Sequence, residues 1–286
     1  MHYADYKTIL SPKNGMNVYR GCTHGCIYCD SRSTCYQMDH VFEDIEIKRD
    51  APEILAVQLR KRRQPVMIFT GAMSDPYIHL ESEVEYTRKC LEVIYQAGFG
   101  VNILTKSDRI LRDLDILKKI NNKTKAVVQM TLTTKDEDLC KVVEPNVSTT
   151  AARVAALKAF RDAGIPTVVW LGPFLPFIND STENIQGVLD LCLAAGVKGI
   201  ICFGVGMTLR EGNREYYYEK LDEHFPGTKQ KYIETFGNSY NIPAYRAQEK
   251  LNLIRQFCKE HGILFHGAAF AYMAEFETDY GQMSLF

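Results

Sequence analysis

The stretch MNVYRGCTHGCIYCD (residues 16–30) decides the fold, because it joins a short apolar run to a dense group of cysteines. The run 16–20 has the length and apolar character of a buried strand. Cys22, Cys26 and Cys29 follow it, in a segment whose Gly and His content suits a loop better than a core. Three thiolates this close on a flexible loop can converge on one soft metal centre.

Two kinds of metal centre make different demands on this loop. A structural zinc ion needs a fourth ligand, which Cys35 or His24 could supply. An iron–sulfur cluster held by only three cysteines leaves one iron open for a substrate. The density of cysteines favours the cluster, and zinc stays the alternative.

Outward from this loop, short apolar runs alternate with amphipathic segments. Several of the runs end in Gly or Thr, and residues 81–96, 149–163 and 182–195 carry apolar side chains at helical spacing. Six βα units in succession predict an α/β fold, either an open parallel sheet or a barrel-like one, with ligands at the carboxyl ends of the strands. The predicted strands are 16–20, 66–70, 100–105, 126–133, 166–172 and 199–204.

Composition narrows the class of protein further. The chain has 286 residues, of which 46% are hydrophobic and 24% charged, and these values exclude bulk disorder. The net charge of −1 provides no general attraction to nucleic acid or anionic lipid. The longest apolar stretch, 166–178, is interrupted by prolines and is too short to span a membrane. With nine cysteines, an odd number, and no apolar signal peptide, we expect a cytoplasmic protein without a disulfide framework.

The CxxxCxxC motif, with Tyr28 before its third cysteine, resembles the radical S-adenosylmethionine (SAM) superfamily. The resemblance implies a partial (βα)6 barrel with a C-terminal helical extension. It also implies a [4Fe–4S] cluster on Cys22, Cys26 and Cys29, with SAM as the second cofactor. An electron from a flavodoxin or ferredoxin-type donor would cleave SAM reductively, and the resulting 5′-deoxyadenosyl radical would take a hydrogen atom from the substrate.

A closer resemblance, from about residue 17 to residue 206, is to the spore photoproduct lyase-like branch. It is carried by the cysteine motif, TGAMSD (70–75), LTK (104–106), and VEP (143–145) followed by Arg153. The resemblance implies that Tyr28 takes part in a radical relay. It further implies that SAM is bound by Gly71, Ser74, Lys106 and Thr131.

Two positions depart from the pattern of that branch. Ala72 stands where the lyase has its hydrogen-donor cysteine, and Asp30 stands where it has a second tyrosine. Cys35 is a conceivable substitute donor. The sequence therefore leaves three hypotheses: repair of DNA lesions in the manner of the lyase, radical chemistry on a substrate other than nucleic acid, and a zinc-stabilised binding protein.

We expect four regions along the chain. Residues 1–15 form an N-terminal arm, 16–206 the partial barrel, 207–274 an extension that covers it, and 275–286 a tail. The tail ends in a pentapeptide that resembles the motif by which bacterial DNA repair and replication proteins bind the sliding clamp, which predicts the clamp and DNA as partners. Its residues are Gln282, Met283, Ser284, Leu285 and Phe286.

Overall fold

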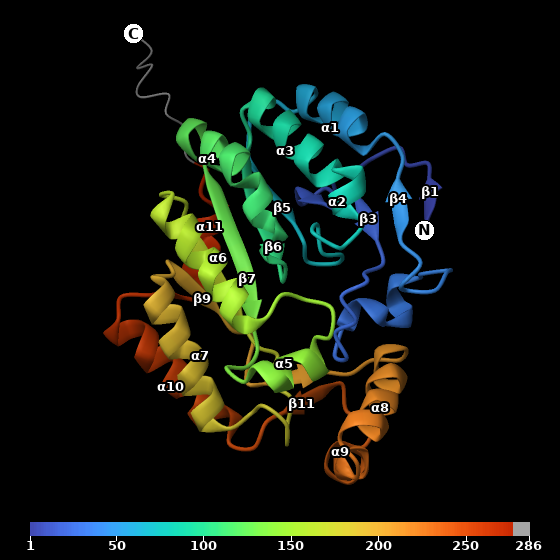
Figure 1. Cartoon of the computed structure of the whole chain (residues 1–286), viewed down its shortest axis with the longest axis vertical. Coiled ribbons are helices and arrows are strands. Elements are labelled where there is room, and N and C mark those ends of the chain that lie inside the picture. The colour runs from blue at the N-terminus through green and yellow to red at the C-terminus, as the bar shows by residue number, and fades with distance from the viewer. Residues whose placement is uncertain (277–286) are drawn as a thin grey trace.

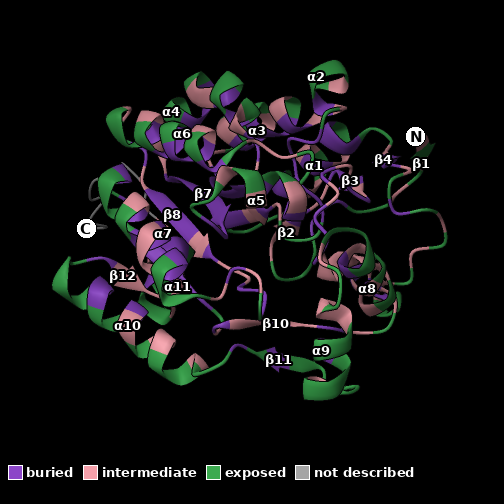
Figure 2. Cartoon of the chain, turned by 60° about the horizontal axis from the view of Figure 1, so that its bottom comes forward, coloured by how far each residue is buried: buried purple, intermediate pink, exposed green. Residues whose placement is uncertain are grey.

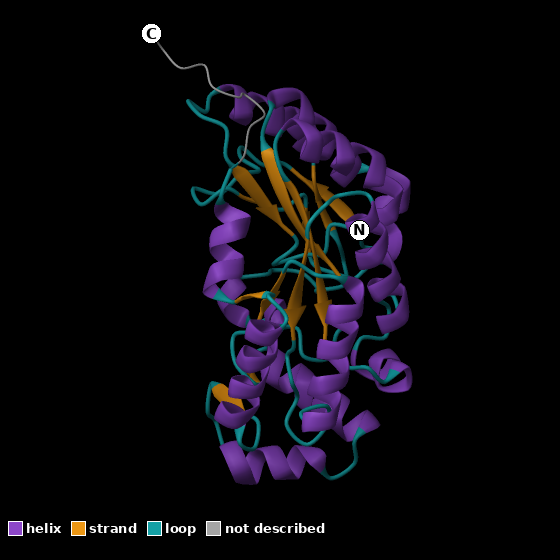
Figure 3. Ribbon diagram, turned by 90° about the vertical axis from the view of Figure 1, so that its left-hand side faces the viewer, coloured by secondary structure: helices purple, strands orange, loops and turns teal. Residues whose placement is uncertain are grey.

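A seven-stranded parallel sheet forms the centre of the computed structural model, which describes residues 1–276 (Figures 1 and 3). The strand order is β12-β9-β8-β7-β6-β5-β2, and each neighbouring pair is parallel. The strands are β2 (Gly15–Met16), β5 (Met67–Thr70), β6 (Gly100–Thr105), β7 (Ala126–Leu132), β8 (Thr167–Leu171), β9 (Gly199–Ile201) and β12 (Leu264–Phe265). This arrangement confirms the predicted α/β partial barrel.

Helices cover the two faces of the sheet unequally. Every residue of β6 and β7 is buried, as the apolar runs predict, and the main core lies between the sheet and the helices outside it (Figure 2). A second, smaller apolar cluster joins the other face to α11 (Gly267–Ala274). The outer helices are α1 (Ala51–Arg60), α3 (Tyr86–Ala97), α4 (Leu114–Lys123), α6 (Thr150–Asp162), α7 (Thr182–Ala195) and α10 (Ala247–Glu260).

The first predicted strand, 16–20, is wrong as a single element. Its first residue ends β2 in the main sheet, whereas Tyr19–Arg20 forms β3 in a separate sheet. There β3 pairs antiparallel with β4 (Glu46–Lys48), which pairs parallel with β1 (His2–Ala4). The strand is divided because the chain leaves the main sheet after Met16 and pairs with β4 before it enters the cysteine loop.

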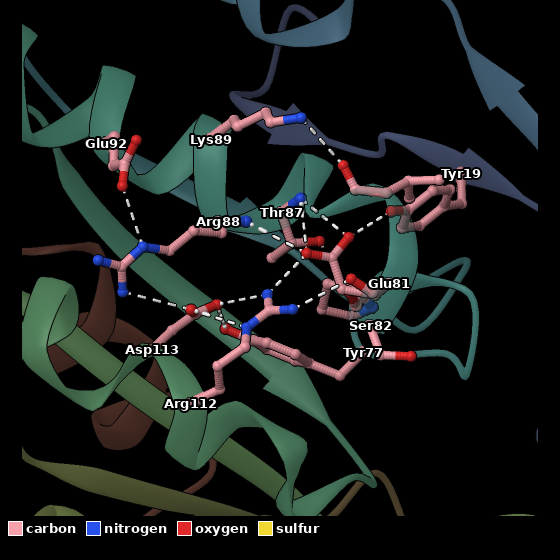
Figure 4. Close-up of polar contacts among 12 residues, drawn as sticks. Tyr19, Tyr77, Glu81, Ser82, Thr87, Arg88, Lys89, Glu92, Arg112 and Asp113 are labelled. Carbon is pink, nitrogen blue, oxygen red and sulfur yellow. Dashed lines mark hydrogen bonds and ion pairs between the residues drawn. The ribbon is translucent and has the colours of Figure 1, made fainter.

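The predicted helix 81–96 is also divided, at Glu85, whose φ is 54°. The segment forms α2 (Glu81–Val84) and then α3. The Glu81 carboxylate accepts the backbone N–H groups of Thr87 and Arg88 at 3.0 and 3.3 Å, so this buried side chain satisfies donors at the start of α3 (Figure 4). The apolar spacing continues across the break, which is why the periodicity did not reveal it.

The chain after residue 206 adds a two-stranded sheet, further helices and one strand of the main sheet, while the predicted division of the chain into four regions stays a prediction. β10 (Gly206–Thr208) pairs antiparallel with β11 (Asn241–Pro243), and α8 (Asn213–His224) and α9 (Thr228–Phe236) lie between them in sequence. β12 then adds a strand to the main sheet beside β9. The remaining short elements are η1 (Asp30–Arg32), η2 (Thr34–Tyr36), η3 (Asp108–Asp113) and α5 (Glu137–Val143). Among the described residues, no helix combines the length and apolar character needed to span a membrane.

Candidate functional site

The three cysteines of the motif line one small cavity at the carboxyl edge of the sheet. Cys22 and Cys26 are buried and Cys29 is half-buried. Gly71, which follows β5, and Lys106, which follows β6, line the same cavity. Because β5 and β6 are parallel neighbours, their ends bring these two residues to the cysteine loop.

Glycine is required where backbones approach each other beside the cavity. Gly71 has a φ of +98°, and a Cβ atom there would lie 1.8 Å from the carbonyl oxygen of Leu104. Gly21, with a φ of +87°, would place a Cβ atom 2.4 Å from the carbonyl oxygen of Phe42. No other side chain fits at either position. These contacts hold the loop after β5 against β6, and the cysteine loop against the segment before β4.

Lys106 places a positive charge among the thiols. Burial opposes its charge, but Cys26, Glu144 and Cys29 outweigh burial and raise its pKa. Burial also opposes charge on the thiols, and it raises the pKa of Cys26. At Cys22 the hydrogen bond from His24 outweighs burial, so the pKa of Cys22 is lowered. The local charge therefore favours a thiolate at Cys22, as a metal ligand requires.

A buried His–Asp pair beside the cysteines was not identified from the sequence. Nδ1 of His24 lies 3.3 Å from Oδ2 of Asp75, and both side chains line the cavity. Burial opposes both charges, yet the pair raises the pKa of His24 to about 10 and lowers that of Asp75 to about 2. Asp75 also accepts from the Thr105 hydroxyl at 2.7 Å and from the Lys106 backbone at 2.8 Å.

Ser74, predicted as a SAM contact, donates its hydroxyl to the carbonyl oxygen of Gly21 at 2.5 Å. It is buried but is not among the residues that line the cavity, whereas Asp75 is. The TGAMSD segment was therefore the available signal for Asp75. Asp75 follows Ser74 directly in the sequence, but this position did not reveal that Asp75 pairs with His24, because His24 comes from a distant segment. The assignment of Ser74 to SAM stays a prediction.

Tyr28 belongs to a second buried network behind the cysteine loop. Its hydroxyl donates to Glu144, and Nη2 of Arg153 lies 2.6 Å from Oε2 of Glu144. Neither Glu144 nor Arg153 has an exposed side chain. Nη1 of Arg153 donates to the carbonyl oxygen of Thr131 at 2.7 Å, so the backbone of this predicted SAM contact joins the network. Burial, followed by the Glu144 charge, raises the pKa of Tyr28 well above its usual value.

Cys35 lies outside the cysteine cavity. Its thiol is exposed and accepts a hydrogen bond from Nη1 of Arg210 at 3.3 Å. Its predicted role as a substitute hydrogen donor is not supported by a place at the cavity, and it stays a prediction. The pentapeptide 282–286 lies outside the described residues.

The spacing of the motif cysteines fits a cluster better than a single ion. Among the described residues, His2, His40 and Asp44 form the one group with three possible ligand atoms within 4.8 Å of one another. At least one pair of the three thiols is therefore more than 4.8 Å apart, wider than the ~3.8 Å that separates sulfur ligands around one tetrahedral zinc ion. A cubane of four irons spreads its thiolates further apart. The donor set at Cys22, Cys26 and Cys29 thus fits a [4Fe–4S] cluster.

Comparison with known proteins agrees with this geometry. The model of the radical SAM superfamily matches residues 16–192. The chain is 30% identical to an uncharacterized protein of Mycobacterium tuberculosis over 81% of this chain and 69% of that protein. It is 29% identical to an uncharacterized protein of Methanocaldococcus jannaschii over 60% of this chain and 64% of that protein.

Solved structures share the fold at low sequence identity. Spore photoproduct lyase complexed with dinucleoside spore photoproduct matches with a TM-score of 0.63 and 15% identity, covering 87% of this chain and 74% of that chain. SuiB of Streptococcus suis, bound to the precursor peptide SuiA, matches with a TM-score of 0.53 and 12% identity, covering 92% of this chain and 48% of that chain.

The cofactors of the matched family are a [4Fe–4S] cluster and SAM, and the thiols that line the cavity suit the cluster. When bound, the cluster supplies the electron that cleaves SAM, and such enzymes need an external reductant. The three thiols, Lys106 and Gly71 line the cavity, and their roles toward the two cofactors stay predictions. The chain therefore belongs to the radical SAM superfamily, and it is a radical SAM enzyme whose cofactors are a [4Fe–4S] cluster and SAM.

Proposed function

We propose that this enzyme takes a hydrogen atom from a damaged nucleic acid, in the manner of spore photoproduct lyase. The observation that carries the proposal is a cavity of about 430 Å³ at the carboxyl ends of β8 and β9. It opens at the same edge of the sheet as the cysteine cavity, and β8 and β9 lie two and three strands away from β6, which ends at that cavity. Strand spacing separates the two by roughly 10–15 Å, which is within reach of a SAM-sized cofactor and its substrate.

The wall of this cavity is suited to a planar ring. Trp170 and Phe203 line it with their ring centroids 5.3 Å apart, and Phe203 as a residue is 70% exposed. The indole N–H of Trp170 donates to Oε1 of Gln129 at 2.6 Å, which fixes the orientation of the ring. An aromatic platform of this kind stacks with a nucleobase and contributes about 1–3 kcal/mol per base. A chain with a net charge of −1 gains affinity from stacking more readily than from phosphate contacts.

In this proposal, the hydrogen atom that the product radical takes up in the last step comes from a different donor than in the lyase. Ala72 lines the cysteine cavity at the position where the lyase-like branch has its donor thiol. A methyl group is not a hydrogen donor for a product radical. The structurally similar lyase was solved with its dinucleoside photoproduct, which supports a nucleotide substrate while leaving the donor to be identified.

Measurement of 5′-deoxyadenosine tests the substrate class. The full chain, with its cluster reconstituted anaerobically, is reduced with dithionite and given SAM alone or together with UV-irradiated DNA, undamaged DNA or a peptide mixture. We expect irradiated DNA to raise the rate of 5′-deoxyadenosine formation at least tenfold over the rate with SAM alone. Equal rates in all mixtures would contradict the proposal, and stimulation by peptide alone would favour the substrate class other than nucleic acid.

Variants of the aromatic wall locate the substrate. Trp170→Ala and Phe203→Ala are expected to raise the KM for irradiated DNA at least tenfold while leaving SAM cleavage without substrate unchanged. Phe177→Ala is the matched control, because this aromatic side chain is 48% exposed and does not line the cavity. The same increase in KM in all three variants would contradict a role of the cavity in binding the substrate.

The terminal pentapeptide supports recruitment to DNA by the sliding clamp. Gln282, Leu285 and Phe286 carry the resemblance to the clamp-binding motif, and tethering to the clamp would offset the lack of a net positive charge. A pull-down with bacterial sliding clamp compares the full chain with a chain ending at Gly281. We expect binding by the full chain alone, and equal binding by both chains would exclude the motif as the contact.

A further inference from the structure

Four polar side chains gather on the small sheet beside the cysteine loop. His2 begins β1, Glu46 begins β4, and the two are register partners in this parallel pair. His40 and Asp44 come from the loop that leads into β4. One ligand atom from each of His2, His40 and Asp44 lies within 4.8 Å of the other two. None of the four residues lines the cysteine cavity.

The hydrogen bonds of His40 leave a lone pair directed into this group. Its Nδ1 lies 3.0 Å from the carbonyl oxygen of Val41, an acceptor, which assigns the proton to Nδ1. Its Nε2 is buried, has no hydrogen-bond partner among the described residues and lies 3.8 Å from Oε2 of Glu46. A lone pair and a carboxylate that face each other without a proton between them repel, and a bound cation removes this repulsion.

Nδ1 of His2 lies 3.0 Å from Oδ2 of Asp44, and the amino group of Met1 lies 2.6 Å from Oδ1 of the same carboxylate, so an ion bound by Asp44 replaces at least one of these contacts. The distances from the two imidazoles to Glu46 are close to those between ligands of one ion. Nε2 of His2 also lies 3.8 Å from Oε2 of Glu46, which is too long for a hydrogen bond. Two ligand atoms in a tetrahedral zinc site are about 3.4 Å apart, so both imidazoles stand close to ligand spacing from this carboxylate. The other oxygen of Glu46 accepts from the hydroxyl of Tyr6, which orients the carboxylate as a supporting partner of a metal ligand does.

We propose that His2, His40 and Asp44, with Glu46 beside them, bind a divalent transition-metal ion of the zinc type, separate from the iron–sulfur cluster. Two imidazoles and a carboxylate are a usual ligand set for zinc. The side chains of His2 and Asp44 are each 41% exposed, so water fills the remaining coordination position and the ion enters from solvent. The Glu46 side chain is only 8% exposed and forms the inner wall.

From this position, the ion stabilises the loop that contacts the cysteine motif. His40 and Asp44 flank Phe42, which lines the cysteine cavity and whose carbonyl oxygen accepts the N–H of Cys22 at 3.1 Å. An ion held by both residues and by His2 ties this loop to β1. The ion thereby keeps Phe42 against the first cluster ligand.

Zinc binding by the holoenzyme tests the site. The full chain, expressed without an N-terminal extension and with its cluster reconstituted, is dialysed against buffered Zn²⁺ and analysed for metals. We expect one zinc per chain in addition to the cluster iron, with X-ray absorption at the zinc edge showing nitrogen and oxygen ligands at about 2.0–2.2 Å. His40→Gln and Asp44→Asn should each weaken the zinc Kd at least tenfold.

A matched histidine variant serves as the control. His261→Gln, at the exposed end of α10, should leave the zinc Kd unchanged. Asp44 is partly exposed, so Asp44→Asn is expected to fold, which circular dichroism checks. Sulfur ligands at about 2.3 Å around the zinc, or an unchanged Kd in both ligand variants, would overturn the proposal.

Discussion

Arg153 and Glu144 carry opposite charges into the interior, where neither side chain is exposed. Each is costly to bury alone, and together with Tyr28 they form a network immediately behind Cys29. Burial opposes ionisation of Glu144, but Arg153 and Lys106 outweigh it and lower the pKa of the carboxyl group. The pair thus keeps a negative charge beside the hydroxyl of Tyr28 at neutral pH.

Arg153→Met should therefore destabilise the protein by about 3–5 kcal/mol, because Glu144 is left buried without its cation. Urea unfolding under anaerobic conditions measures the change. Arg246→Met is the control, because Arg246 is 59% exposed in its pair with Glu249, and we expect a change within about 0.5 kcal/mol. Similar losses in the two variants would show that the buried pair has no special contribution.

Ser74→Ala distinguishes a structural role of this serine, through its hydrogen bond to Gly21, from its predicted role as a SAM contact. The structure gives its hydroxyl to the carbonyl oxygen of Gly21, so the variant should lose about 1–3 kcal/mol of stability and retain less iron. Ser82→Ala, which removes a similar but exposed bond to the carbonyl oxygen of His79, should change neither. If Ser74 acts chiefly as a SAM contact, the SAM Kd will rise while unfolding and iron content stay unchanged.

At the scale of elements, the contact between β9 and α11 seals the inner face of the barrel. Gly199 faces the helix, and a Cβ atom there would lie 2.9 Å from the Cβ of Ala269 and 3.2 Å from the carbonyl oxygen of Leu264. Asn102, on β6, donates to the carbonyl oxygen of Met273 at 2.9 Å, which ties the end of α11 to the sheet. The sheet and the helix therefore have no room for a larger residue between them.

Gly199→Ala is expected to cost about 1–3 kcal/mol through overpacking. Gly267→Ala, in α11 itself, meets nothing within 4 Å and should instead gain a few tenths of a kcal/mol to about 1 kcal/mol from helix propensity. Thermal and urea unfolding of the two variants provide the comparison. A neutral Gly199→Ala would mean that α11 shifts freely and does not seal the barrel.

At the scale of the whole molecule, the last described elements complete a sheet that begins near the N-terminus. β12 pairs with β9, and α11 covers the apolar side chains of Val127, Val168 and Ile201. A chain ending at Gly262 lacks both elements, so it exposes this apolar face and the edge of β9. The C-terminal region is therefore expected to be part of the folding unit.

We expect the chain ending at Gly262 to aggregate or to unfold without a cooperative transition. A chain ending at Phe276 keeps β12 and α11 and should remain monodisperse. Size-exclusion chromatography and urea unfolding distinguish these outcomes. A monodisperse and cooperatively folding short chain would show that the barrel is stable without its last strand.

The predictions from sequence succeeded where the signal is local. Apolar runs on both faces of a strand specify the parallel sheet, which the structure confirms. The spacing of Cys22, Cys26 and Cys29 indicated the family, which the comparison confirms, while their role as ligands stays a prediction. Lys106 and Gly71 both line the cysteine cavity, because each follows a strand and carboxyl ends of parallel strands share one edge. Their contacts with SAM stay predictions. These inferences need only a few neighbouring residues.

The errors and omissions arose where distant residues decide the outcome. The helix break at Glu85 depends on a carboxylate at Glu81 that caps α3, and the division of 16–20 depends on pairing with β4. By itself, the sequence determined the α/β class and the radical SAM family, because hydrophobic period and thiol spacing are properties of short segments. Only the tertiary structure decided that His24 meets Asp75 and that His2 meets His40, because buried charges and ligand groups are stabilised by partners that the folded chain brings together.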